Sequence, residues 1–97
     1  MFALVGRVEI KPGHEDETAT MVRDHGRALV DGMSGSKSAY WARCLGDSGE
    51  LVQHSFWLFD TQDDARAAET VFTSLRDMPN APATFISADV CEVIAQA

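Results

Sequence analysis

Apolar side chains occupy both alternating positions in three segments of this sequence that have strand character. A strand points successive side chains to opposite faces of its sheet, so a strand with one wet face alternates apolar and polar residues. Residues 2–10, 50–59 and 84–94 are instead apolar at both positions. We therefore expect a sheet that is covered on both faces.

A helix is expected between the first two strands. Pro12 and Gly13 end the first strand, and the acidic residues 15–17 that follow suit the positive end of a helix dipole. The helix is predicted to run to about residue 32. Apolar residues at helical spacing predict its sheet-facing side: Val22, Gly26, Leu29 and Met33.

A second helix is expected after the segment Thr61-Gln62-Asp63-Asp64, which is typical of a capping box. Pro79 and Pro82 stop this helix, because proline cannot continue one. Its predicted buried side again follows helical spacing: Ala65, Ala68, Phe72 and Leu75. In the strand after it, Ile86, Val90 and Ile94 are expected to alternate against Phe85, Cys91 and Val93.

Residues 38–45 also have strand character, and the turn at residues 46–49 folds them into a hairpin with residues 50–59. The order βαββαβ predicts one ferredoxin-like α+β domain over residues 1–97, with a four-stranded antiparallel sheet. Right-handed crossovers place both helices on one face of this sheet. The simplest cover for the open face is a second copy of the chain, so we expect a homodimer.

The formal net charge of −7 argues against nucleic acid and membrane surfaces as partners. The eight basic residues are scattered along the sequence without a run of three. Neither a secretion leader nor a membrane-spanning stretch is visible, so a cytoplasmic location is expected. Cys44 and Cys91 are isolated in the sequence and are interpreted as reduced structural thiols.

Two segments, Lys11-Pro12-Gly13-His14-Glu15 and residues 57–65, carry a resemblance that spans nearly the whole chain. The chain resembles the dimeric α/β-barrel superfamily and, within it, the antibiotic-biosynthesis-monooxygenase-like (ABM) domains. The resemblance implies a cofactor-independent monooxygenase that acts on an aromatic or quinol-type small molecule, with no bound cofactor. Two alternatives stay open: a non-catalytic small-molecule-binding or regulatory protein, and the amino-acid-binding regulatory domain that has the same strand order.

The haem-degrading branch of the family expects three residues that this chain lacks. The resemblance places its Asn at Gly6, its Trp at Ala68 and its haem-ligating His at Met78. Haem degradation is therefore not expected, although His25 stays open as a different ligand. The three histidines have no paired spacing, so we expect no metal site.

Three side chains are candidates for acid–base work on a phenolic substrate: His54, Tyr40 and His25. His54 shares a strand face with Phe56 and would face either a pocket or the dimer interface. His25 lies at the edge of the apolar side of the first helix, and Tyr40 could hydrogen-bond a substrate oxygen. An ordinary structural role is the alternative for each histidine.

An aromatic pocket between the sheet and the helices would suit such a substrate. Trp57, Trp41 and Phe72 are candidates to line it, and Arg43 could stabilise a phenolate. Aromatic residues at strand or helix spacing are also ordinary core residues. Tyr40 and Trp41 point to opposite faces, so at most one of them lines any given pocket.

Overall fold

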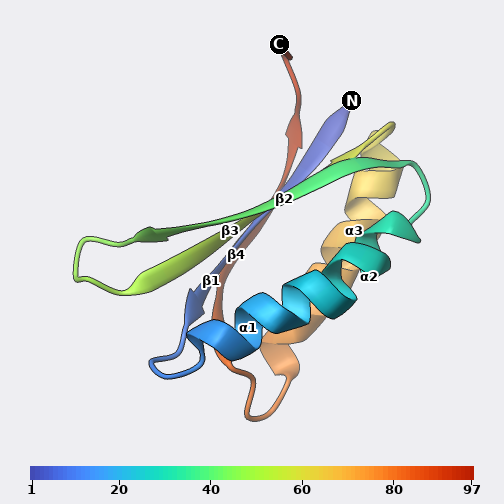
Figure 1. Cartoon of the computed structure of the whole chain (residues 1–97). Helices are drawn as coiled ribbons and strands as arrows, with labels where there is room; N and C mark the ends of the chain where they lie inside the picture. The colour runs from blue at the N-terminus through green and yellow to red at the C-terminus, as the bar shows by residue number, and fades with distance from the viewer.

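The computed structural model describes all 97 residues and has a layer of helices on one side of a sheet (Figure 1). The antiparallel sheet has the strand order β2-β3-β1-β4. This arrangement confirms the predicted ferredoxin-like α+β fold. The strands are β1 (Phe2–Ile10), β2 (Ser36–Leu45), β3 (Leu51–Phe59) and β4 (Ala83–Glu92). The helical elements are α1 (Glu15–Met21), the π-helical turn η1 (Val22–Gly26), α2 (Arg27–Asp31), α3 (Gln62–Thr73) and the 3-10 turn η2 (Ser74–Asp77).

The hydrophobic core lies between the sheet and the helices. Leu4 of β1 and Phe59 of β3 are fully buried, and Phe72 of α3 packs against the same strands. Gly6 lies directly under the Phe72 ring, and a Cβ atom at this position would collide with that ring. Glycine at position 6 therefore lets α3 approach the middle of the sheet closely.

The capped start of α3 is as predicted. Thr61 is the N-cap, and its Oγ1 accepts a hydrogen bond of 3.2 Å from the backbone N–H of Asp64. The buried side of α3 consists of Ala65, Ala68 and Phe72. Leu75 was expected to continue this side, but it lies in η2 and is 41% exposed. The α-helix ends at Thr73, so Leu75 lies beyond the last turn in which the predicted helical spacing applies.

The first helix departs from regular α-helical spacing at η1. Val30 is buried, whereas Leu29, which was predicted to face the sheet, is 50% exposed. A π turn contains more residues than an α turn, so the residues after it reach the sheet one position later than a count of 3.6 per turn predicts. The row that faces the sheet therefore runs through Val22, Gly26 and Val30.

A register shift in the β1–β4 pairing changes which residues of β4 face the core. Arg7 pairs with Ser87, but its neighbour Val8 pairs with Phe85, so Ile86 is an extra residue. Phe85, Ala88 and Val90 pack on the core in consequence. The simple alternation predicted for residues 84–94 is therefore wrong, and Ile94 lies beyond the end of the strand.

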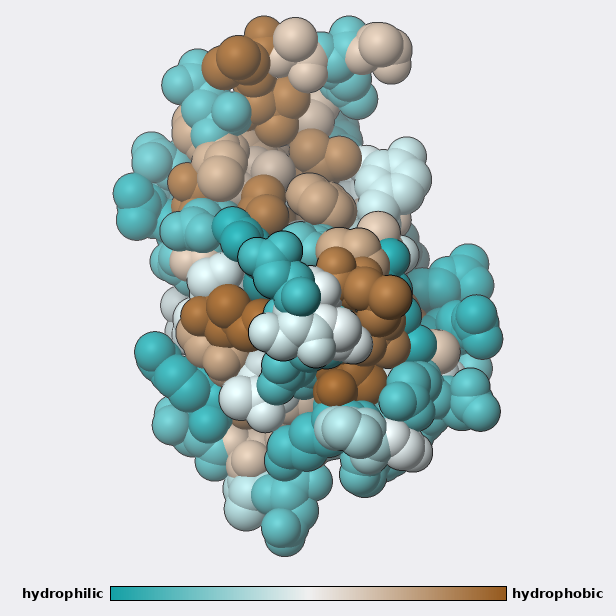
Figure 2. Space-filling model, turned by 90° about the vertical axis from the view of Figure 1, so that its left-hand side faces the viewer, coloured by the Kyte–Doolittle hydropathy of each residue, from teal (hydrophilic) through white to brown (hydrophobic).

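The other face of the sheet carries no helix. Alternation along the strands gives this open face Val5, Tyr40, His54, Phe56 and Leu58. Tyr40 is 63% exposed and Phe56 is 38% exposed. Figure 2 views the molecule from the left of Figure 1, the side toward which the β2–β3 hairpin projects, and shows brown patches of apolar surface between polar residues. None of the helices combines the length and the apolar character needed to cross a bilayer.

Candidate functional site

A groove of about 640 Å³ lies between the first helical segment and β2. It is on the helix-facing side of the sheet, at the edge where β2 has no neighbouring strand. The lining comes from α1, η1, α2, β2 and the buried end of Gln53 on β3. The side chains that decide its chemistry are Arg23, Arg27, Asp31, Lys37, Trp41, Arg43 and Gln53.

The groove is rich in positive charge. Four of the eight basic residues of this acidic chain line it, namely Arg23, Arg27, Lys37 and Arg43, against the single carboxylate of Asp31. Lys37 Nζ lies 3.2 Å from Asp60 Oδ1, but the three arginines form no ion pair. An anion that enters the groove therefore meets guanidinium groups that are not engaged in ion pairs.

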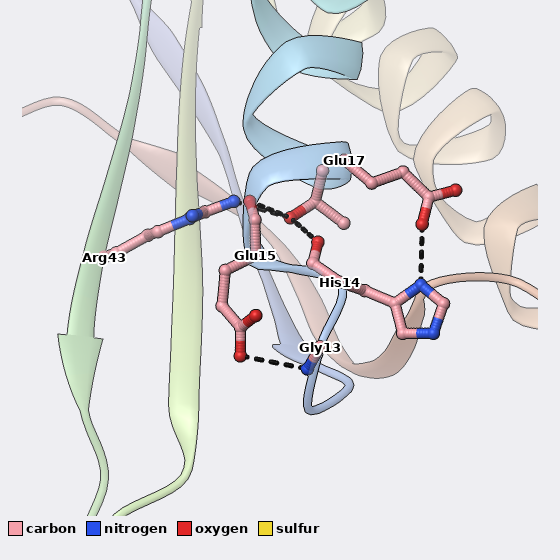
Figure 3. A network of polar contacts seen from close by, with 6 residues as sticks. Gly13, His14, Glu15, Glu17 and Arg43 are labelled. Carbon is pink, nitrogen blue, oxygen red and sulfur yellow. Dashed lines mark hydrogen bonds and ion pairs between the residues drawn. The ribbon is translucent and has the colours of Figure 1, made fainter.

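Arg43 is the most firmly positioned of these cations. Its Nη2 donates a hydrogen bond of 2.6 Å to Thr18 Oγ1 on α1, and its Nε donates one of 3.1 Å to Gln53 Oε1 on β3. Thr18 is 5% exposed, and its hydroxyl lies 2.9 Å from the carbonyl of His14 and 3.0 Å from that of Glu15. Figure 3 shows Arg43 reaching from its strand to the first turn of α1. The remaining guanidinium donors make no hydrogen bond within the protein.

The loop before α1 holds this first turn in place. Glu15 Oε1 accepts a hydrogen bond of 3.2 Å from the backbone N–H of Gly13, and His14 Nδ1 lies 2.6 Å from Glu17 Oε2 (Figure 3). Backbone N–H groups of Glu15 itself and of Gly13 lower the pKa of the Glu15 carboxyl below its ordinary value. Thr18 belongs to the same first turn of α1, so the contacts that hold this turn in place also support the hydrogen bond between Thr18 and Arg43.

Trp41 forms the aromatic part of the groove. Its ring packs edge-on against Trp57 at 6.2 Å between centroids, and Trp57 packs edge-on against Phe72 at 5.6 Å. Trp57 and Phe72 are buried and do not line the groove, so they support Trp41 from behind. The Nε1–H of Trp57 is buried without a hydrogen-bond acceptor.

The structure separates the residues proposed for catalysis from those proposed for substrate binding. Trp41 and Arg43 lie together in the groove. His54 lies on the open face of the sheet, where its Nε2 is 3.2 Å from Cys44 Sγ and its ring stacks on Phe56. His54 therefore does not face the pocket between the sheet and the helices; it lies on the face for which a second copy of the chain was predicted as the cover.

The other two candidates for catalysis also lie outside the interior of the groove. Tyr40 is at the rim of the groove, but it is paired with Phe56, so its side chain belongs to the open face. His25 is exposed on η1 and does not line the groove. No histidine lines the groove.

Sequence reasoning missed Arg23, Arg27, Lys37 and Asp31 as site residues. The basic residues appear scattered along the chain, and only the packing of α1, η1 and α2 over β2 brings four of them together. The sequence contained one signal of a charged site. Arg23 and Arg27 are four residues apart on the predicted helix, and two like charges at this spacing repel each other and weaken the helix.

Of the three positions that the resemblance assigns to a haem-degrading site, two belong to the core and the third lies on the surface. Gly6 is covered by the Phe72 ring, and Ala68 is 2% exposed against the sheet. Met78 is 51% exposed beyond η2. The side chains present therefore do not fit a haem centre of that kind. No three His, Cys, Asp or Glu side chains cluster so that they could hold a metal ion.

Comparison with solved structures shows a similar fold. A crystal structure of an MhuD mutant with two manganese protoporphyrin IX bound per active site matches with a TM-score of 0.67 and 13% sequence identity. The match covers 100% of this chain and 98% of that one. No curated protein matches the sequence.

The family comparison covers most of the chain. The family described as "Antibiotic biosynthesis monooxygenase" (ABM) matches residues 1–70, which include β1, the whole first helical segment, the β2–β3 hairpin and most of α3. The groove is built entirely from this matched part. The chain therefore belongs to the antibiotic biosynthesis monooxygenase family.

Proposed function

We propose that this protein binds an aromatic or quinol-type small molecule in the groove and oxidises it with molecular oxygen, without a bound cofactor. The observation that carries the proposal is the position of Trp41 beside Arg43 in a groove of about 640 Å³, a volume suited to a small organic ligand. The aromatic ring offers an apolar contact for a planar substrate, and the guanidinium offers donors for a substrate oxygen. Family membership supports the type of reaction.

The positive charge of the groove supplies the activation that such a substrate needs. Cations beside a phenol favour its ionised form, and the phenolate is the electron-rich species that reacts with oxygen. Arg43 is held by Thr18 and Gln53 before the substrate arrives, so little reorganisation is needed. The phenolic proton leaves to solvent or to Asp31, the carboxylate in the lining.

The overall reaction balances without another reductant. For an anthrone, whose ring methylene is activated by the phenolate, CH2 and O2 give C=O and H2O. The substrate itself provides the electrons that reduce the second oxygen atom to water. The role of the protein is to bind the substrate, favour its anion and keep water away from the reacting carbon.

Oxygen uptake with a panel of hydroquinones and anthrones tests the proposal. We expect uptake with the natural sequence and a fall of about 10²-fold in kcat/KM for Arg43→Gln, the size of effect seen when a stabilising donor is removed. Arg66→Gln is the matched control, because Arg66 is exposed on α3 and does not line the groove. No uptake with any member of the panel would overturn the oxidation.

The variant His54→Ala distinguishes the two faces of the sheet. If oxidation takes place in the groove, this substitution on the open face should leave the affinity for the substrate intact. Loss of both binding and turnover, with the fold and the assembly preserved, would place the chemistry at His54 instead.

Ligand binding without turnover is the second candidate function. It is favoured by one observation, the lack of a histidine in the groove, since histidine is the most common general acid or base near neutral pH. Ligand-induced stabilisation without oxygen uptake would support this function.

We also infer that a second copy of the chain covers the open face. Large apolar or aromatic side chains are exposed on the open face and at the bulge of β4, namely those of Tyr40, Phe56 and Ile86. Such a surface is typical of a protein–protein contact. A homodimer also agrees with the dimeric α/β-barrel superfamily that the sequence resembles.

A further inference from the structure

We infer that the ligand of the groove is an aromatic acid, a planar ring that carries a carboxylate. This inference rests on the proposed function, because it names the substrate class of the same groove. It comes from the distribution of charge rather than from the family. The chain has fifteen acidic and eight basic residues, but the groove is lined by four basic residues and only one acidic residue.

Arg23 and Arg27 are the central observation. They follow one another at a spacing of four residues on η1 and α2, both line the groove, and neither forms an ion pair. Two guanidinium groups at this spacing weaken a helix slightly, and a chain with an excess of carboxylates could neutralise them. Their arrangement is explained if an anionic ligand lies between them and β2.

The π turn keeps the charged row aligned with the groove. In a regular α-helix, residues four apart drift around the axis by about 40° at each step. A π turn contains more residues than an α turn and therefore offsets this drift, and η1 is a π turn. As a result Ala19, Arg23, Arg27 and Asp31, spaced by four residues, all line the groove.

Arg43 faces this row from the strand side. Its Nε and one Nη2 hydrogen atom are already used by Gln53 and Thr18, so its guanidinium plane is fixed and its remaining donors are unpaired. A guanidinium group matches the two oxygens of a carboxylate in a planar, bidentate contact. Trp41, two residues earlier on the same strand and face, provides the apolar contact for the ring.

A matched ligand pair tests the inference: 2,5-dihydroxybenzoate, and 2,5-dihydroxybenzamide, in which the charge is removed and the ring is kept. Binding is measured by titration calorimetry, and oxygen uptake is recorded on the same samples. We expect the acid to bind about tenfold more tightly than the amide, with a preference that decreases as salt is raised. In Arg23→Gln/Arg27→Gln the preference should largely disappear, whereas Arg66→Gln should retain it.

The outcomes separate this inference from the proposed oxidation. A preference for the acid, combined with no oxygen uptake with these compounds or with any hydroquinone or anthrone of the panel, supports the inference and overturns the oxidation. Equal binding of acid and amide, with oxygen uptake, overturns the inference and leaves the oxidation in place. Failure of both compounds to bind overturns the inference. Arg23 and Arg27 are exposed and make no side-chain hydrogen bond, so thermal unfolding should show that their replacement leaves the fold intact.

Discussion

The Nη2 atom of Arg43 lies 2.6 Å from Thr18 Oγ1, and this hydrogen bond joins β2 to the first turn of α1 across one end of the groove. Thr18 is buried, and its hydroxyl also contacts two backbone carbonyls, so it cannot easily move away from the guanidinium group. The orientation of Arg43, the cation proposed to bind the ligand, therefore depends on a residue of the helix, which in turn depends on the loop before it.

Replacement of Thr18 by valine tests this dependence. The substitution keeps the shape of the side chain but removes the acceptor for Arg43, and we expect it to lower the free energy of unfolding by about 1–3 kcal/mol, the range for a charged donor that loses its buried partner. Binding of 2,5-dihydroxybenzoate should weaken more than binding of the amide. Thr20→Val, an exposed position on α1, is the control and should change neither. A Thr18→Val protein with unchanged preference for the acid would show that Arg43 needs no such support.

The contact between Gly6 and Phe72 leads to a prediction about stability. A methyl group at position 6 would enter the space of the Phe72 ring, so Gly6→Ala should lower the free energy of unfolding by about 1–3 kcal/mol, as overpacked cores do. Urea denaturation measures this change. The second substitution Phe72→Leu should recover part of the loss in the Gly6→Ala background, because it vacates that space.

Gly32 provides the control for this experiment. It ends α2 with a φ of −83°, and a Cβ atom there would meet only ordinary contacts. Gly32→Ala should therefore be neutral, or stabilising by about 0.4–1 kcal/mol through the unfolded state. Equal stability of Gly6→Ala and Gly32→Ala would contradict the close packing of α3 on β1.

The limits of prediction from the sequence appear at three places. The order of the elements, the cap at Thr61 and the hairpin follow from local signals, so they could be predicted. The exposure of Leu29 and the extra residue Ile86 could not, because π turns and bulges depend on tertiary packing rather than on local pattern. The charged lining of the groove was missed for a related reason. Its residues converge only when the π turn has set the direction of Arg23 and Arg27.

The lowered pKa of Glu15 predicts a dependence of stability on pH. A carboxyl whose pKa is lower in the folded state contributes stability that is fully present above its ordinary pKa and is lost as pH falls through the folded value. Thermal unfolding between pH 6 and pH 3 should therefore show a loss of stability at the acidic end that is smaller in Glu15→Gln. Asp16→Asn, an exposed neighbour, is the control. Identical pH profiles for Glu15→Gln and the natural sequence would contradict the role of the Gly13 and Glu15 backbone donors.

The proposed dimer predicts a different response to charge on the two sides of the molecule. Phe56 lies near the middle of the open face, and a carboxylate there would have to be desolvated in a sheet-to-sheet interface. In analytical ultracentrifugation we expect the natural sequence to sediment as a dimer at micromolar concentration, and Phe56→Glu to weaken the association by about 30-fold or more, as loss of a central interface residue does. Leu75→Glu is the control, because Leu75 has a similar exposure of 41% but lies on the helical side. If the natural sequence sediments as a monomer, or if both variants dissociate equally, the second copy does not cover the open face of this sheet.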